Sequence, residues 1–172
     1  MTTHGRATGK SVRLSVLNDA AHEAFYGLPD FDEGQQQEFL SLSAAELELA
    51  TRRSGLPARS YCIVQMGYFK AKHAFFRFTP QEVEGDYRFV AWRYFSEASF
   101  PYKTITDHKD YAQHKLIADF FGYCLWSGSV TTALNSWAVQ LVRRDVTPGF
   151  VSTELICWLN ENKIIRPAYF TL

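Results

Sequence analysis

The 172-residue sequence has few cysteines, no long apolar run and no net charge, and each shortage excludes a class of protein. Its three cysteines, Cys62, Cys124 and Cys157, are odd in number and far apart, which excludes a disulfide framework. They predict free thiols buried among apolar neighbours in a reducing compartment. No apolar stretch reaches the roughly 18 residues that cross a bilayer, so a membrane span is excluded. The polar N-terminal segment lacks the apolar core of a secretory signal, so we expect a cytoplasmic protein.

The sequence also lacks the short motifs that carry enzyme chemistry. It has no glycine-rich phosphate loop, no zinc-ligand spacing and no nucleophile elbow. His108 and His114 would face different directions on a helix, so they cannot share one metal ion. Glu82, Glu84 and Asp86 fall in the first turns of an expected helix, where acids interact favourably with the helix dipole. We therefore expect neither catalysis nor a cofactor in this chain, and an independent enzyme is the weakest alternative.

Helix-capping signals recur along the chain, whereas alternating strand patterns and tight hairpin turns are absent. The strongest signal is Thr79, Pro80 and Glu82, which predicts a helix that runs through Tyr94. Other helix starts are predicted at Asn18 with Asp19, Asp32 with Gln35, Ser43 with Glu46, Pro57, Thr106 with Asp107, and Thr147 with Pro148. Apolar spacing predicts a further amphipathic helix over residues 130–144. The fold is therefore predicted to be all-α.

The helical period is lost around Phe100, Pro101 and Tyr102, which predicts a boundary between two small helical units. We expect a flexible N-terminal tail over residues 1–16, a first unit over residues 17–101 and a second unit over residues 102–172.

The zero net charge hides an uneven distribution of charged residues. An acidic segment, residues 32–48, contains Asp32, Glu33, Glu38, Glu46 and Glu48 and no base. It is followed by a basic segment, residues 49–81, which contains no acid and the bases Arg52, Arg53, Arg59, Lys70, Lys72 and Arg77. Such a segment concentrates the positive potential that binding of a phosphate backbone requires, whatever the total charge of the protein.

The basic segment also has the outline of a helix-turn-helix. A helix over residues 44–53 is followed by a short turn containing Gly55 and by a second helix that opens at Pro57. The first turn of that second helix would face the major groove, where Arg59 could read guanine edges or clamp a phosphate. An ordinary antiparallel helix pair with solvated arginines has the same outline, so the spacing leaves both interpretations open.

Phenylalanines alternate with bases in the same segment, at Phe69, Phe75, Phe76 and Phe78. They could form stacking platforms for single-stranded nucleic acid. They could equally form a core over which the lysines extend their charged ends to solvent, and we favour the core.

Four stretches carry a family resemblance: FYGLPDF from Phe25, FLSLSAAELELATRRSGLPARSYCIVQMGYFKAKHAFFRFTPQEV, HKLIADFFGY and WLNENKIIRPAYFTL. Together they resemble the N-terminal region of TnpA-type transposases of the Tn-three family, which move by replicative transposition. The resemblance covers nearly the whole chain after about the first 20 residues. It implies tandem helix-turn-helix-like units, similar to those of centromere-binding protein B, that recognise the terminal inverted repeats of a transposon.

The resemblance further implies that the chain is a fragment of a larger DDE-type transposase whose catalytic acids lie in a distant domain. It implies a bacterial cytoplasmic protein that is associated with the nucleoid when bound to DNA. The sequence departs from many relatives at SGLPARS, where a base-rich turn is common. The DNA-binding residues carried over are Arg52, Arg53, Arg59, Ser60, Lys70 and Lys72 in the first unit, and Lys103, His108, Lys109 and Lys115 in the second.

We therefore expect sequence-selective binding of double-stranded DNA, with no metal, no cofactor and no membrane partner. The alternative is a non-catalytic protein-interaction or oligomerisation module, in which the acidic segment of one subunit docks on the basic segment of another. Self-association stays open under both interpretations.

Overall fold

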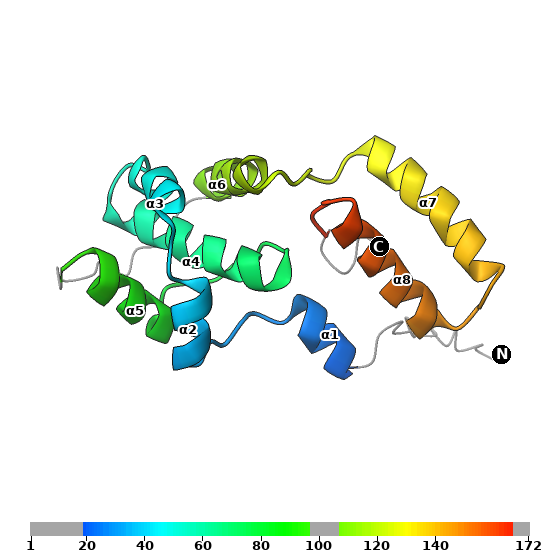
Figure 1. Cartoon of the computed structure of the whole chain (residues 1–172), viewed down its shortest axis with the longest axis horizontal. Helices are drawn as coiled ribbons and strands as arrows, with labels where there is room; N and C mark the ends of the chain where they lie inside the picture. Colours follow the sequence, from blue (N-terminus) through cyan, green and yellow to red (C-terminus); the bar gives the residue numbers. More distant parts are fainter. Residues whose placement is uncertain (1–18, 97–106, 167–172) are drawn as a thin grey trace, which may run out of the picture.

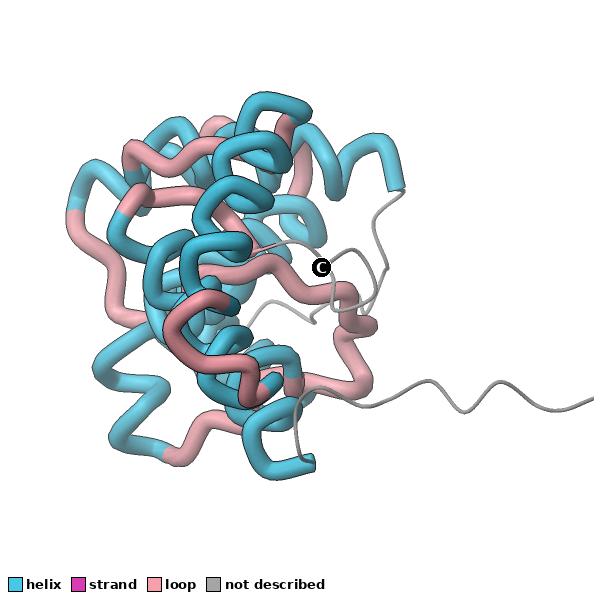
Figure 2. The backbone as a smooth tube through the Cα atoms, turned by 90° about the vertical axis from the view of Figure 1, so that its right-hand side faces the viewer, coloured by secondary structure: helices cyan, strands magenta, loops and turns pink. Residues whose placement is uncertain are grey.

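The computed structural model describes residues 19–96 and 107–166, and this part of the chain is all-helical, as predicted. Figure 2 shows helices joined by loops; within the described ranges the only extended pairing is an isolated bridge between Cys124 and Ile164. The helices, labelled in Figure 1, are α1 (Asp19–Tyr26), α2 (Glu33–Phe39), α3 (Ala44–Thr51), α4 (Leu56–Lys72), α5 (Glu84–Tyr94), α6 (Asp107–Phe121), α7 (Gly128–Val142) and α8 (Pro148–Glu161).

Two predicted capping boxes form and set the starts of α2 and α3. The Ser43 backbone N–H donates to the Glu46 carboxylate over 2.6 Å, and the Glu46 N–H donates to the Ser43 hydroxyl over 3.3 Å. Asp32 and Gln35 make the same reciprocal pair over 3.1 and 2.8 Å. These bonds satisfy N–H groups that have no partner inside the first turn of a helix.

The helix start predicted from Thr79, Pro80 and Glu82 is wrong by about one turn. Thr79 and Glu82 do form a capping box, in which the Thr79 N–H donates to the Glu82 carboxylate over 2.7 Å. Residues 80–83 nevertheless form turns, and α5 begins only at Glu84. Val83 is 6% exposed and has a non-helical backbone, with φ −123° and ψ 39°. Burial of Val83 in the core therefore overrides the local cap.

Helix α4 forms the centre of the fold. Every residue from Ser60 to Phe69 is buried, because α2, α3 and α5 pack against this helix and α6 lies across its first turns (Figure 1). Gly67 brings α2 unusually close: a Cβ at this position would lie 2.4 Å from Cδ2 of Leu40, which is fully buried. The absence of a side chain at residue 67 thus allows the close contact between the two helices.

The phenylalanines of the basic segment belong to this core. Phe69, Phe76 and Phe78 are buried, and Phe75 is half-buried between the rings of Phe69 and His114. The core interpretation is therefore confirmed, and these rings do not form an exposed stacking platform.

Helices α7 and α8 form an antiparallel hairpin at the other end of the molecule from α3 and α5 (Figure 1). The hairpin has its own small cluster of buried residues, Leu134, Leu159 and Ile164. Helix α6 falls in the predicted second unit, yet it contributes Ile117 and Ala118 to the large cluster around α4. The predicted boundary at residues 101 and 102 and the predicted tail over residues 1–16 lie outside the described residues.

The three cysteines are free, as predicted, but their burial differs from the prediction. Cys62 is buried in α4, and burial raises the pKa of its thiol to about 12. Cys124, in the segment between α6 and α7, and Cys157, on α8, are exposed. Within the described residues, no helix combines the length and apolar content that spanning a membrane requires.

Candidate nucleic-acid interface

The turn between α3 and α4 brings together three of the predicted DNA-binding residues. Gly55 has φ +84°, in the left-handed region that favours glycine, and lets the chain reverse between Thr51 and Leu56. The Nε of Arg59 donates to the backbone carbonyl of Arg53 over 2.9 Å, which ties the first turn of α4 to the end of α3. The turn is therefore fixed by the same residues that give it positive charge.

Arg52 lies on the exposed side of this turn. Its guanidinium lies 2.5 Å from the Glu48 carboxylate one helical turn earlier, and both side chains are 65% exposed. An exposed pair of this kind contributes only about 0.3–0.5 kcal/mol, so Arg52 can exchange Glu48 for another anion at little cost.

The first turn of α4 exposes less than the sequence predicted. Ser60 is fully buried, and its hydroxyl donates to the Leu56 carbonyl over 2.8 Å. This predicted DNA-binding residue therefore bonds within its own helix and is not exposed to a ligand. Ala58 is 8% exposed, whereas Pro57 and Arg59 are half-buried. Of Arg59 and Ser60, the two predicted DNA-binding residues in this turn, only Arg59 reaches the surface.

Lys70 and Lys72 lie at the opposite end of α4, roughly 17 to 20 Å along the helix from Arg59. The Lys70 ammonium donates to the Ser41 carbonyl over 3.2 Å and lies 3.4 Å from the Glu46 carboxylate. The Lys72 ammonium donates to the carbonyls of Gly27 and Glu23 over 2.7 and 3.1 Å, and burial lowers its pKa. Lys70 thus holds the start of α3 on α4, and Lys72 holds the end of α1. Neither lysine lies near the turn between α3 and α4.

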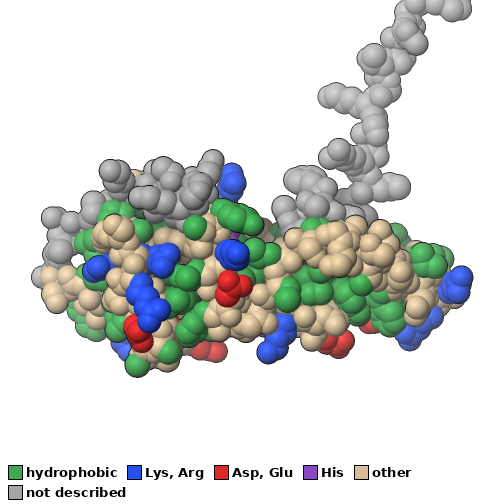
Figure 3. Space-filling view, turned by 90° about the horizontal axis from the view of Figure 1, so that it is seen from above, with side chains coloured by type: hydrophobic (Ala, Val, Ile, Leu, Met, Phe, Trp, Pro, Cys, Tyr) green, Lys and Arg blue, Asp and Glu red, His purple; other side chains and the backbone are tan. Residues whose placement is uncertain are grey.

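Of the four residues predicted in the second unit, Lys115 is exposed on α6. Lys103 lies outside the described residues, and the side chains of His108 and Lys109 are not described although both belong to α6. The Gln113 amide donates to the Ala58 carbonyl over 3.0 Å, so α6 lies directly against the first turn of α4. Figure 3, which views the molecule from above Figure 1, shows several Lys and Arg side chains at the end that holds α3 and α6.

A buried polar network fixes α6 in this place. The Asp110 carboxylate accepts from the Tyr61 hydroxyl over 2.8 Å and from Nε2 of His114 over 2.9 Å. Burial alone would raise the pKa of Asp110, but the hydrogen bonds from His114 and Tyr61 outweigh it and hold that pKa below its usual value. The network therefore keeps the Asp110 carboxylate buried where α6 packs against α4.

The acidic segment pairs with the basic segment inside one chain. Glu46 lies against Lys70, and Glu48 lies against Arg52. The second pair is four residues apart in the sequence, a spacing that could have revealed it. The first pair depends on the packing of α3 on α4 and has no local signal. In the part of the chain that the structure describes, no group of three or more His, Cys, Asp or Glu side chains could hold a metal ion.

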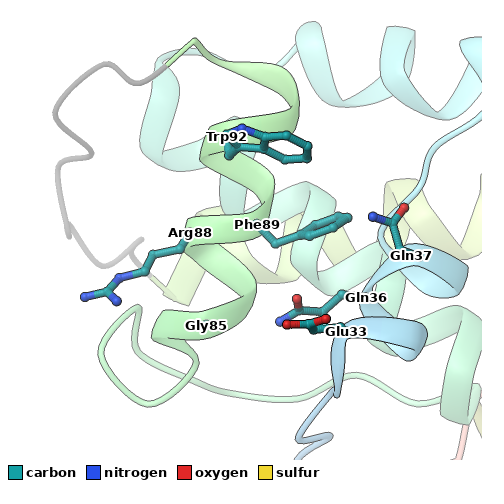
Figure 4. Close-up of a pocket in the computed structure, with 7 residues that line it drawn as sticks. All are labelled: Glu33, Gln36, Gln37, Gly85, Arg88, Phe89 and Trp92. Carbon is teal, nitrogen blue, oxygen red and sulfur yellow. The ribbon is translucent and has the colours of Figure 1, made fainter.

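A second surface was not predicted from the sequence. A groove of about 450 Å³ lies between α2 and α5, and Trp92 stands at its edge with 66% of its surface exposed (Figure 4). The residues that line this α2–α5 groove are Glu33, Gln36, Gln37, Gly85, Arg88, Phe89 and Trp92. The helical spacing of Gly85, Arg88, Phe89 and Trp92 was the available signal, since these positions share one face of a helix.

A family model described as "Domain of unknown function (DUF4158)" matches residues 16–172. No curated protein and no solved structure matches the chain.

Proposed function

We propose that this chain, which belongs to the DUF4158 family, binds double-stranded DNA and recognises the terminal inverted repeats of a transposon as the N-terminal part of a larger transposase. The observation that carries the proposal is the arginine turn between α3 and α4, where Arg52, Arg53 and Arg59 lie together and Lys115 of α6 lies on the adjoining helix. The protein would act in the bacterial cytoplasm and be associated with the nucleoid when bound to DNA.

The start of α4 is suited to a phosphate group. The N-cap residue is Gly55, which has no side chain to accept from the first N–H groups of the helix. A helix N-terminus carries partial positive charge and N–H groups that can bind an anion. Arg59 and the exposed Arg52 flank this end of the helix, so a DNA phosphate placed there would meet both guanidinium groups.

The burial of α4 limits how it would contact DNA. Because Ser60 to Phe69 are inside the core, α4 would touch DNA with its first turn and would not lie along the groove. Arg59 is then the residue of this turn that can reach a base edge, while Arg52, Arg53 and Lys115 hold phosphates. Phosphate contacts position the protein, and a bidentate arginine contact to guanine supplies selectivity.

Fluorescence anisotropy with labelled duplexes tests the proposal. The full chain is expected to bind the terminal repeat that flanks its gene more tightly than a scrambled duplex, with an affinity that falls steeply with salt. Equal binding to both duplexes, or no binding at low salt, would contradict sequence-selective recognition.

Variants of the arginine turn separate the proposed roles. Arg52→Ala is expected to weaken binding to both duplexes and to reduce the salt slope by about 1, because a phosphate contact is lost. Arg59→Lys keeps the charge but not the guanidinium fork, so it should lower selectivity by about 1–3 kcal/mol. Arg143→Ala is the matched control, since Arg143 is exposed at the far end of α7.

The coding sequence downstream of Leu172 tests the transposase assignment. The proposal expects the reading frame to continue into a long protein with a distant set of catalytic acids. A continuous frame that encodes an unrelated domain would contradict it, even if the chain binds DNA.

A further inference from the structure

Sequence-selective binding requires more base contacts than the arginine turn supplies. Proteins that recognise a DNA site bind it roughly 10³ to 10⁷ times more tightly than other sequences. One bidentate contact to a base discriminates by only about ten- to a hundredfold. In the arginine turn Arg59 alone can reach a base edge, because Ser60 to Phe69 behind it are buried. A chain with the proposed function therefore needs a second element that reads bases.

Helix α7 has the charge and the exposure that this role requires. Among the helices that the structure describes, only α4 and α7 contain no Asp or Glu, and α4 is largely buried. Acids on a helix repel the phosphates on both sides of a DNA groove, so the other helices are less suited. In contrast to α4, helix α7 buries only Leu134 and Leu141.

The exposed surface of α7 has the composition of a binding surface. None of its exposed residues is charged, and they are Gly128, Ser129, Thr131, Thr132, Ala133, Asn135, Ser136, Val139, Gln140 and Val142. A helix face in water usually carries charged side chains, whereas loss of charge marks the centre of an interface. In Figure 3 the part of the molecule that holds α7 is covered mostly by uncharged side chains, with Lys and Arg at its far end.

The residue types on this surface favour DNA over a protein partner. Thr132, Asn135 and Ser136 share the outward face of the first half of α7, opposite Leu134. Asparagine pairs bidentately with adenine, and serine and threonine bind base edges of either kind. Protein interfaces are instead enriched in aromatic residues and depleted in serine and alanine. The one aromatic residue of α7, Trp137, is half-buried, so the outward face has the character of a helix that reads bases.

The polar groups of this face are available to a ligand. The Asn135 amide has no hydrogen-bond partner among the described residues. The hydroxyls of Thr132 and Ser136 donate to the carbonyls of Gly128 and Thr132, each over 3.1 Å, which leaves their lone pairs free to accept. The face therefore offers one amide that can pair with a base in two bonds, flanked by two hydroxyl acceptors.

The start of α7 lies on the same side of the molecule as the arginine turn. Figure 1 shows α3, α6 and the start of α7 along the upper side, and Figure 3 looks down on that side. Lys163 is exposed, and the Cys124 N–H donates to its carbonyl over 2.8 Å, so it stands beside the segment that leads into α7. A duplex along this side would meet positive side chains at both ends, whereas Arg143, about 12 Å beyond Asn135 along the helix, would lie outside the contact.

We propose that the first half of α7 reads base edges in the major groove of the DNA that the arginine turn holds. Thr132, Asn135 and Ser136 would meet the bases, and Lys163 would hold a neighbouring phosphate. An α-helix fits the major groove, and recognition helices contact bases through their N-terminal residues. This inference rests on the proposed function and adds the element that gives it selectivity.

Fluorescence anisotropy of the full chain with the terminal repeat and with a scrambled duplex tests the role of α7. The wild-type chain is expected to prefer the repeat. Asn135→Ala should reduce that preference by about tenfold or more and leave the affinity for the scrambled duplex nearly unchanged, because a base contact is lost. Lys163→Ala should weaken binding to both duplexes and reduce the salt slope by about 1, because a phosphate contact is lost.

Two exposed residues away from this face provide matched controls. Gln37 on α2 carries the same amide group as Asn135, and Gln37→Ala should leave both affinities unchanged. Thr153 on α8 is exposed, and its hydroxyl donates to the Gly149 carbonyl over 2.9 Å in the same i, i−4 bond that Thr132 makes. Thr132→Ala should lower the preference for the repeat, and Thr153→Ala should not. Circular dichroism verifies that each variant is folded.

A base analogue tests the Asn135 contact directly. 7-Deazaadenine lacks the N7 acceptor to which an asparagine amide donates. Placed at each adenine of the repeat in turn, it is expected to weaken wild-type binding severalfold at one position and to leave binding by Asn135→Ala unchanged there. If no position of the repeat shows this coupling, Asn135 does not read adenine and its assigned role is wrong.

The outcomes separate the role of α7 from DNA binding itself. A chain that prefers the repeat, but whose Asn135→Ala and Thr132→Ala variants behave like their controls, overturns the role of α7 and leaves the proposed function standing. Variants that lose affinity for both duplexes equally also overturn it, because α7 then binds without reading bases. A wild-type chain that does not prefer the repeat contradicts the proposed function, and the role of α7 fails with it.

Discussion

Asp110 is one of the residues that join α6 to α4, and it makes the stability of this contact dependent on pH. Its pKa is lower in the folded chain than in the unfolded chain, so its contribution to stability is present above about pH 4 and is lost as the pH falls through the folded value. Asp110→Asn is expected to lower the free energy of unfolding by about 1–3 kcal/mol at pH 7, and by less at pH 3. Urea denaturation at the two pH values measures this difference. Asp119→Asn, exposed on the same helix, is the control, and a loss at Asp110 that does not change with pH would refute the assignment.

Single residues also show which parts of the candidate site a sequence can predict. The position of Arg59 at the turn between α3 and α4 was predictable, because the nearby Gly55 and Pro57 mark the turn and the start of the helix. The direction of the Lys72 side chain was not predictable, because its ammonium is held by the Gly27 carbonyl, 45 positions earlier in the chain. A basic side chain near a predicted turn therefore indicates a charged surface only when no distant carbonyl lies within its reach.

Helix α4 depends on a close approach that a single methyl group would prevent. A Cβ at residue 67 would lie 2.4 Å from the buried Leu40 side chain and 3.3 Å from the Phe39 carbonyl oxygen. Gly67→Ala is therefore expected to lower the free energy of unfolding by about 1–3 kcal/mol, although alanine favours helices elsewhere. Gly128→Ala, at the start of α7 with no atom within 4 Å of its Cβ, should be neutral or stabilising by up to about 1 kcal/mol. Equal effects of the two substitutions in thermal or urea denaturation would show that the helix contact is not tight.

Helix starts were predictable where the local cap and the packing agree. Ser43 and Pro148 mark the starts of α3 and α8 as the sequence predicts. The helix start predicted at Thr79 is wrong, because burial of Val83 imposes a non-helical backbone conformation there. That burial comes from the packing of the large cluster around α4. Local capping rules thus locate a helix to within one turn, while packing decides its first residue.

The whole molecule is unevenly stabilised between its two ends. The large cluster surrounds α4, whereas α7 and α8 bury only Leu134, Leu141, Ile156 and Leu159. Backbone hydrogen bonds of Cys124 with Lys163 and Ile165 join the segment before α7 to the segment after α8. Hydrogen exchange followed by mass spectrometry should therefore show faster exchange in α7 and α8 than in α4, because a smaller cluster opens more often. Equal protection of the hairpin and α4 would indicate that the described chain unfolds as one cooperative unit.

Because Cys62 is buried and the other two cysteines are exposed, the reactivity of the thiols can be used to follow the unfolding of the chain. A maleimide reagent is expected to modify Cys124 and Cys157 in the folded state, because both residues are exposed. Cys62 is fully buried and its thiol stays protonated, so it becomes reactive only when α4 separates from its neighbours. The rate at which the third thiol is alkylated then measures how often the centre of the fold opens, with no label or mutation added.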